Sequence, residues 1–532
     1  MSSFIERVRR LPTLGVGVST EYGAHDDAAA LDLEAVASAG LADFLEVGVE
    51  VSKGVDGHAR RWVERGLPTT YHFLDVNLDD PRDFDAAWLD GLRREVAVVR
   101  PAWLCGDAGM WHFGRRDRGQ MLLLPPVLEP AAAQQLAWGV DALRANTGLE
   151  VLPENPPGTA FLGSMHLLDF FALVADRADT GLLLDVAHLA IYQHATGRGP
   201  RDGFDGFPWD RVVEVHLAGG AMRSKGDFSW IEDTHGVEVL DSAWRIFEEA
   251  VARAPNLRAV VVECERNPLQ RAAPLLERVR ALVPSLVPAP GDAPIPPPRV
   301  GLPPPEVAVA SAQAAAVLAC FDGVWPAPEG ARRDAFDTDP HRVGRALQAL
   351  ADEYPVSFAH VGLARARQFF RSEAFESVVR DGGSMAVAFG AWAPAADMGV
   401  LEHAMARARR PGPPPPPGRV EFAPGVAFCE VAEDTLARWD AARDALAGRL
   451  RPGPSVLVTV PRESVPVGVL VTGGTTRTPR GEELPAALTA VLRLVPTTVE
   501  ALVAAAGAAG ADPGEDAAVV DGLLAEGVLV AG

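Results

Sequence analysis

The stretch Gly181-Leu-Leu-Leu-Asp-Val-Ala-His188 decides the predicted fold. A short apolar run ends in an acid, Asp185, and a histidine, His188, follows within one helical turn. Such a run predicts a buried strand that delivers both side chains at its carboxyl end, where they can bind a metal. An Asp at the end of a strand also serves as a helix cap, so this stretch alone leaves both roles open.

The same arrangement recurs along residues 1–285, where apolar runs repeatedly stop at a residue type that binds metals. The other runs end at His72, Asp107, Glu154, His216 and Glu263. Segments with the apolar spacing of helices, such as 84–99 and 131–146, lie between them. Alternating strand and helix units, eight in all, predict an α/β fold, a parallel (β/α)8 TIM barrel, with its chemistry at the carboxyl ends of the strands.

A further pair of candidate ligands, Asp233 and His235, is expected in a loop. The candidate metal ring then has nine members, histidines and carboxylates without a thiolate: His72, Asp107, Glu154, Asp185, His188, His216, Asp233, His235 and Glu263. This ligand set suits iron, manganese or zinc. Nine ligands exceed the needs of one ion, and a carboxylate can bridge, so we expect two or three metals about 3.5–4 Å apart.

Simpler roles exist for single members of the ring. Asp107 has the character of an ordinary loop acid, Glu263 has a possible ion-pair partner in Arg266, and the whole set would also suit a polar barrel mouth without metal. His112 and His194 are the best candidates for a role just outside the ring.

Composition limits the classes of function. The net charge of -22 argues against non-specific nucleic-acid binding, because a phosphate backbone requires a basic surface. The four cysteines have no CxxC spacing, so neither a disulfide framework nor a zinc ribbon is indicated, and Cys105 and Cys264 are expected to be buried. The first residues lack an apolar signal core and no long apolar run follows, which predicts a cytoplasmic protein without a membrane segment.

Proline tracts divide the rest of the chain. We expect a barrel domain at 1–285, a Pro-rich linker at 286–305, a mainly helical domain at 306–412, and an α+β region at 419–532 with strands at 455–460 and 467–471. The last segment, 498–532, has the pattern of a winged helix but contains neither Lys nor Arg. Without a cation to meet phosphate, DNA binding is disfavoured.

Several motifs carry a resemblance. Leu-Pro-Glu-Asn-Pro (152–156), Leu-Leu-Asp-Val-Ala-His (183–188), Val-His-Leu-Ala-Gly-Gly (215–220), Asp-Thr-His (233–235) and Val-Val-Glu (261–263) resemble the multinuclear non-heme iron-dependent oxidase family of the methanobactin-biosynthesis type, with its xylose-isomerase-like barrel. The resemblance implies two or three irons of mixed Fe(II)/Fe(III) valence and O2 as oxidant. It further implies a ribosomally made precursor peptide as substrate, often modified at a cysteine.

The ring also resembles that of endonuclease IV, a trinuclear zinc barrel. Transferred to this chain, that arrangement gives three groups: His72, Asp107 and Glu154; Glu154, Asp185, His216 and Glu263; and His188, Asp233 and His235. A metal-dependent phosphodiesterase, a sugar isomerase and a non-catalytic scaffold therefore stand as alternatives to the oxidase.

Two stretches depart from the oxidase pattern. After the fourth strand the family usually has Ser-Glu-His, whereas this chain has Cys105-Gly-Asp107. After the first strand the family has an Arg and a His-Tyr pair, whereas this chain has Ser19-Thr-Glu-Tyr22. These changes suggest a subfamily that acts on a different substrate residue.

The segment Arg342-Val-Gly-Arg-Ala, together with Phe369-Phe-Arg further on, is similar to the partner proteins that accompany these oxidases. That similarity implies that the region after the linker binds the leader of the precursor peptide. The basic end of a predicted helix, Arg407-Ala-Arg-Arg410, is expected to contribute charge to that contact. The alternative is that residues 306–532 only stabilise the barrel.

Overall fold

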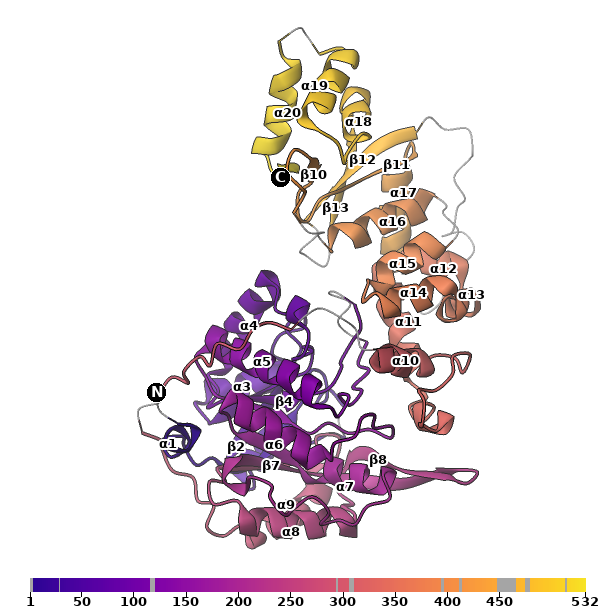
Figure 1. Cartoon of the computed structure of the whole chain (residues 1–532). Helices are drawn as coiled ribbons and strands as arrows, with labels where there is room; N and C mark the ends of the chain where they lie inside the picture. The colour runs from indigo at the N-terminus through magenta and orange to yellow at the C-terminus, as the bar shows by residue number, and fades with distance from the viewer. Residues whose placement is uncertain are drawn as a thin grey trace. The chain divides into compact units, whose positions relative to one another are not determined.

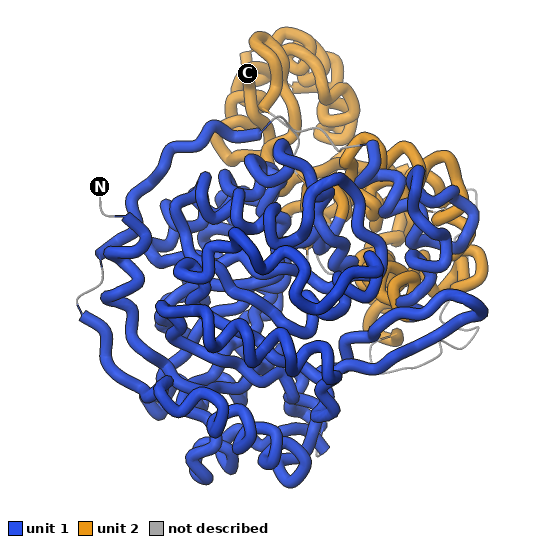
Figure 2. Tube along the Cα trace, turned by 60° about the horizontal axis from the view of Figure 1, so that its bottom comes forward, with its two compact units in different colours: residues 1–112, 118–340 blue, residues 113–117, 341–532 orange. Residues whose placement is uncertain are grey.

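The computed structural model describes residues 3–27, 29–114, 120–292, 295–305, 311–393, 397–410, 414–446, 466–473, 479–511 and 514–532. The chain forms two compact units, which Figure 2 shows in separate colours. Unit 1 comprises Met1–His112 and Arg118–Pro340, and unit 2 comprises Phe113–Asp117 and His341–Gly532.

The described part of unit 1 contains a closed barrel of parallel strands (Figure 1). Its strands follow one another around the barrel in this order: β1 (Gly15–Thr20), β2 (Phe44–Val49), β3 (Thr69–Phe73), β4 (Leu104–Asp107), β5 (Val151–Glu154), β6 (Leu182–Asp185), β7 (Val212–Lys225) and β9 (Ala259–Glu263). Strand β9 pairs with β1 and closes the barrel. The predicted fold class is therefore confirmed.

Helices alternate with these strands and lie on the outside of the barrel (Figure 1). They are α2 (Leu33–Ser38), α3 (Gly57–Glu64), α4 (Ala86–Val99), α5 (Pro130–Thr147), α6 (Leu167–Ala178), α7 (Val186–Ala195), α8 (Asp241–Arg253) and α9 (Leu269–Leu282). Local sequence sets their ends. The Asp85 side chain accepts from two backbone amides at the start of α4, and α5 ends at Gly148, whose φ of 73° favours glycine.

An apolar cluster closes the end of the barrel opposite the ring. Trp103, Leu152, Leu183 and Val213 form one buried cluster with Phe4 of the short amino-terminal helix α1 (Phe4–Val8). Because both faces of parallel strands are covered, each strand consists almost entirely of buried residues up to the point where the ligand-type residues begin.

The predicted loop position of Asp233 and His235 is wrong. Strand β7 continues beyond the barrel and turns at Gly226 into β8 (Phe228–Gly236), which runs antiparallel to it. Both ligand candidates therefore lie on a strand, where backbone pairing to Gly219 and Gly220 fixes their position.

The segment after the barrel packs with unit 1. The Val300 and Gly301 amides donate to the Asp141 carboxylate on α5, at 2.7 Å and 2.8 Å. Further along, helix α10 (Ser311–Ala319) is followed by the 3-10 helix η3 (Arg333–Phe336), and Thr159 Oγ1 donates to the Ala335 carbonyl at 2.6 Å. The proline-rich stretch is thus held along the barrel, and unit 1 extends to Pro340.

Unit 2 begins with helices: α11 (Arg342–Glu353), α12 (Pro355–Val361), α13 (Leu363–Arg367), η4 (Gln368–Arg371), α14 (Glu373–Arg380), α15 (Met385–Trp392) and α16 (Asp397–Ala408). A mixed region follows: β10 (Val420–Phe422), β11 (Ala427–Ala432), α17 (Thr435–Leu446), β12 (Pro466–Thr472), β13 (Arg480–Leu484), α18 (Ala486–Leu492), α19 (Val499–Ala508), α20 (Asp516–Ala525) and β14 (Leu529–Ala531). The strand predicted at 467–471 falls within β12, whereas the one predicted at 455–460 lies outside the described residues.

Two further expectations can be compared with the structure. The four cysteines are free and buried, as predicted for Cys105 and Cys264. Among the described residues, no helix combines the length and the apolar character needed to cross a membrane.

Candidate metal centre

The structure brings all nine members of the predicted ring together at the mouth of the barrel. Four members are the last residues of barrel strands: Asp107 of β4, Glu154 of β5, Asp185 of β6 and Glu263 of β9. Four more lie within strands: His72 on β3, His216 on β7, and Asp233 and His235 on β8. His188 lies in the first turn of α7. Asp233 and His235 are partly exposed, and the others are buried.

Glu154 is the centre of one part of the ring. Its Oε2 lies 2.8 Å from His72 Nε2, and its Oε1 lies 3.4 Å from His216 Nδ1 and 3.5 Å from His188 Nδ1. The donor atoms of His72, Asp107 and Glu154 lie within 4.8 Å of one another. Because the two oxygens of one carboxylate face different histidines, Glu154 has the geometry to bridge two metal ions.

Asp233 is the centre of the other part. Its Oδ2 lies 3.1 Å from His188 Nε2 and 3.3 Å from His235 Nε2. Glu263 joins the two parts, because its Oε1 lies 3.5 Å from His216 Nδ1 and its Oε2 lies 3.7 Å from His235 Nε2. The ring is therefore one continuous network.

Local structure fixes Asp185 and His188. The Asp185 side chain caps helix α7, since its Oδ1 accepts from the His188 amide at 2.6 Å. Asn155 exchanges two hydrogen bonds with the Asp185 backbone, and His188 Nδ1 lies 3.0 Å from the Asn155 carbonyl oxygen. Asp185 thus has the helix-cap role that the sequence left open, with its second oxygen still available to a metal.

The β7–β8 hairpin depends on glycine and on one strained residue. A Cβ added at Gly219 would lie 2.4 Å from the Gly236 carbonyl oxygen, so only glycine permits this close crossing of the strands. His235 has a φ of 45°, which is uncommon for a residue with a side chain. Such strain is found where a surrounding structure holds a functional side chain in place.

Several buried ring atoms lack a hydrogen-bond partner. Among the described residues these atoms include Asp107 Oδ1, Asp185 Oδ2, His216 Nδ1 and Glu263 Oε2. A buried polar atom without a partner is costly, so each such atom in a folded protein requires an explanation. Unpartnered carboxylate oxygens and an imidazole nitrogen that face one another fit the ligand shell of divalent metal ions.

The carboxylates around the ring raise the pKa of its histidines. Burial disfavours the protonated form of His72, but the nearby Glu46 and Glu154 carboxylates outweigh it and raise the pKa to about 10. The same balance of burial against surrounding carboxylates raises the pKa of three other members well above the ordinary value: His188, His216 and His235.

The pKa values of the ring carboxylates shift in opposite directions. Burial, with nearby Glu263, raises the pKa of Asp185 to about 7, and burial, with nearby Glu154, raises the pKa of Asp107 well above its usual range. Burial opposes ionisation of Glu154 and Asp233 too, yet contacts with the histidines hold the pKa of both below the usual range. Opposite shifts on neighbouring acids are typical of functional sites.

Metal binding is expected to release protons. A histidine nitrogen must be deprotonated to bind a metal, and a pKa of about 10 keeps His72 protonated near neutral pH until a metal replaces the proton. The apparent affinity for a divalent metal should therefore rise with pH between about pH 6 and about pH 8. Proton release during metal titration in a weakly buffered solution measures this directly, and a pH-independent affinity would contradict it.

Sequence reasoning missed three buried carboxylates next to the ring. Glu46 on β2 lies 3.1 Å from His216, Glu265 lies 2.6 Å from His235, and Glu214 on β7 accepts from Trp103 at 2.8 Å. Charged residues are rare inside strands that are buried on both faces. This pattern in the sequence could have identified Glu46 and Glu214 as candidates.

The residues suggested for simpler or neighbouring roles lie elsewhere. His112 Nε2 lies 2.9 Å from Asp83, and His194 contacts Ser229, so neither joins the ring. Among the described residues Arg266 pairs with Glu21 at 3.4 Å rather than with Glu263, whose ion-pair partners are His216 and His235.

The fold and the ring together define a class, a (β/α)8 barrel with a buried multi-carboxylate, multi-histidine cluster suited to several metal ions. A comparison with known protein families narrows this class. Residues 25–282 match the model of the family described as RiPP precursor modification enzyme MbnB/TglH/ChrH. The matched range contains every member of the ring.

The curated relatives and solved structures below cover between 42% and 51% of the chain. A UPF0276 protein of Caulobacter vibrioides is 27% identical over 276 residues, 51% of this chain and 94% of the relative. A UPF0276 protein of Neisseria meningitidis serogroup C is 26% identical over 236 residues, 42% of this chain and 80% of the relative. An L-ribulose 3-epimerase has a TM-score of 0.33 at 12% identity, covering 51% of this chain and 94% of its own. Endonuclease IV of Thermus thermophilus has a TM-score of 0.32 at 14% identity, covering 51% and 99%.

Proposed function

We propose that the barrel belongs to this family and is an iron- and O2-dependent enzyme that oxidatively modifies a ribosomally synthesised precursor peptide. The observation that carries the proposal is the buried ring of nine ligand-type side chains with unpartnered donor atoms. The family match over residues 25–282 supports the peptide substrate.

We assign the ring to the three ligand groups that the resemblance to endonuclease IV implies. His72, Asp107 and Glu154 would hold one ion, Glu154, Asp185, His216 and Glu263 the second, and His188, Asp233 and His235 the third. Bound irons would supply the oxidising chemistry together with O2. The convergence of His188 and His235 on one oxygen of Asp233 supports the third group.

The substrate side chain would enter at the β8 side of the ring. The side chains of His235 and Asp233 are 22% and 15% exposed, whereas those of Glu154 and His216 are 1% and 0% exposed. The partly exposed corner is therefore where a peptide residue can approach a metal. The buried remainder excludes water from the reaction.

Recognition of the leader peptide is proposed for unit 2. Its β11-β12-β13 sheet has β13 at an edge, paired with β12 alone among the described strands. An edge strand presents free backbone donors and acceptors, and an extended peptide can add to it as a further strand. The predicted basic helix end contributes less than expected, because Arg409 and Arg410 pair with Glu353 at 3.1 Å and 2.7 Å.

Metal analysis and an anaerobic assay test the function. The purified protein is expected to retain iron, and product formation from a precursor peptide should stop when O2 is removed. An undiminished rate without O2 would contradict the oxidase. Zinc alone, with hydrolysis of a phosphodiester, would instead indicate the endonuclease-like alternative.

A further inference from the structure

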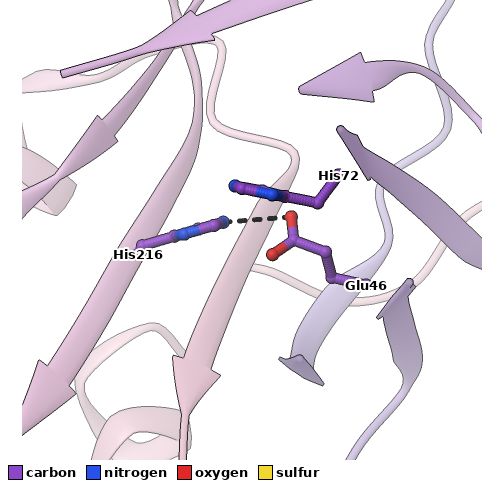
Figure 3. A group of neighbouring side chains, drawn as sticks. All are labelled: Glu46, His72 and His216. Atoms are coloured by element: carbon purple, nitrogen blue, oxygen red, sulfur yellow. Dashed lines mark hydrogen bonds and ion pairs between the residues drawn. The ribbon is translucent and has the colours of Figure 1, made fainter. Parts of the chain in front are cut away.

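Two carboxylates outside the predicted ligand set contact ring histidines through the nitrogen that does not face the carboxylates of the ring. Glu46 Oε2 lies 3.1 Å from His216 Nε2, and Glu265 Oε1 lies 2.6 Å from His235 Nδ1. Both glutamates are buried, with exposed fractions of 1% and 0%. Figure 3 shows the Glu46 carboxylate on β2 reaching the ring of His216 on β7, a strand with which β2 does not pair.

The contact with Glu46 determines which nitrogen of His216 faces the ring. A carboxylate only accepts hydrogen bonds, so Nε2 must donate and Nδ1 keeps its lone pair when the ring is neutral. That Nδ1 is buried without a hydrogen-bond partner and lies 3.4 Å from Glu154 and 3.5 Å from Glu263. Glu46 thus directs the lone pair at Glu154 and Glu263, two of the three carboxylates of the second ligand group.

Glu265 acts on His235 in the same way. Here Nδ1 donates to Glu265, which leaves Nε2 facing Asp233 at 3.3 Å and Glu263 at 3.7 Å. The two histidines use opposite nitrogens toward the ring, and in each case a buried carboxylate occupies the other nitrogen. His188 completes the pattern, because its Nδ1 lies 3.0 Å from the Asn155 carbonyl while its Nε2 faces Asp233.

Each of the two glutamates also accepts a hydrogen bond from a neutral side chain. The Cys105 thiol donates to Glu46 Oε2 at 3.1 Å, the same oxygen that accepts from His216. The Ser19 hydroxyl donates to Glu265 Oε2 at 3.3 Å. Cys105 and Ser19 belong to the two stretches in which this sequence departs from the oxidase pattern, so one residue of each departure lies behind a ring histidine.

We propose that Glu46 and Glu265, held by Cys105 and Ser19, are positioning residues that fix the tautomer and orientation of His216 and His235 for metal binding. The proposal rests on the metal centre put forward above. Carboxylates that accept from a ligating histidine raise its basicity and orient its ring, and their removal typically weakens metal affinity about 10–100-fold.

A direct role as metal ligand is the competing explanation for Glu46. The donor atoms of Glu46, His72 and His216 lie within 4.8 Å of one another, and the rings of the two histidines are 5.9 Å apart (Figure 3). The oxygen of Glu46 that faces His216 already accepts from two donors, however, and a metal there would have to replace both protons. A ligand and a positioning residue differ in one measurable property, the number of metals bound at saturation.

The test titrates iron(II) or cobalt(II) into the metal-stripped full chain and compares Glu46→Ala, Glu46→Gln and Glu265→Gln. Glu46→Ala should bind the same number of metals as the wild type with affinity weakened about 10–100-fold. Glu46→Gln should recover part of that loss, because its amide oxygen still accepts from Nε2. Glu265→Gln should alter the visible spectrum of bound cobalt(II), which reports the geometry around the metal.

Glu150→Gln is the matched control, since Glu150 is also buried in the barrel but pairs with Arg7 and has no contact with the ring among the described residues. It should lower the melting temperature of the metal-free protein about as much as Glu46→Gln does, without the change in metal affinity. Wild-type affinity in Glu46→Ala together with an unchanged cobalt(II) spectrum in Glu265→Gln would refute positioning, and a lower metal count in Glu46→Ala would make Glu46 a ligand. A wild-type chain that binds no metal would overturn the proposed function itself.

Discussion

Replacing Glu154 with alanine is expected to remove most of the bound metal and all turnover. Glu154 faces His72, His188 and His216 with its two oxygens, so its loss removes a ligand from two of the proposed groups at once. The affinity loss should exceed the about 100-fold upper range seen when an outer carboxylate is removed. Metal content after desalting and product formation from a precursor peptide measure the two effects.

His58→Ala is the control for that substitution. His58 lies outside the ring, near Arg61 and Asp26 on the outer face of the barrel. It should keep full metal content and activity, and circular dichroism should show that both variants retain the barrel. Full metal content in Glu154→Ala would show that the ring is assigned wrongly.

The sequence was most informative where a buried strand ends. Parallel strands buried on both faces consist of apolar residues, so a ligand-type residue after such a run stands out, as Glu154 and Asp185 do. The closing of the barrel then brings all strand ends to one mouth. For this reason local patterns far apart in the chain were enough to predict the fold and the gathering of these side chains at one mouth of the barrel.

Residues inside strands were harder to find. Glu46 lies inside β2 and Glu214 inside β7. The alternation of apolar and polar residues along a strand predicts only which face of the sheet a single charged residue lies on. Only the three-dimensional packing shows that these side chains point into the closed interior and contact Cys105, Trp103 and His216. Partners that are distant in sequence cannot be assigned from spacing.

The hairpin that carries Asp233 and His235 was missed for a different reason. Most of its residues are only partly buried. Phe228-Ser-Trp-Ile-Glu232 therefore lacks the continuous apolar run that marks the strands of the barrel. The end of unit 1 at Pro340 could not be predicted either. The proline-rich composition of the stretch indicates a linker and does not show that the Val300 amide donates to Asp141.

Separating the two units is expected to uncouple metal binding from peptide recognition. A barrel chain of residues 1–340 keeps the ring and the segment that packs on α5 and β8. It should bind metal as the full chain does, yet process a full-length precursor far more slowly, because the proposed leader site lies in residues 341–532. Rates with equal concentrations of precursor measure the difference.

Supplying residues 341–532 as a second chain should restore turnover in part, with a rate that rises with its concentration. Covalent linkage through a short connection corresponds to an effective concentration of about a millimolar, which a separate chain at micromolar concentration does not reach. A core peptide without its leader is the control, and the 1–340 chain and the full chain should process it equally slowly. If the 1–340 chain processes the complete precursor as fast as the intact protein, unit 2 has no recognition role and serves only to stabilise the barrel.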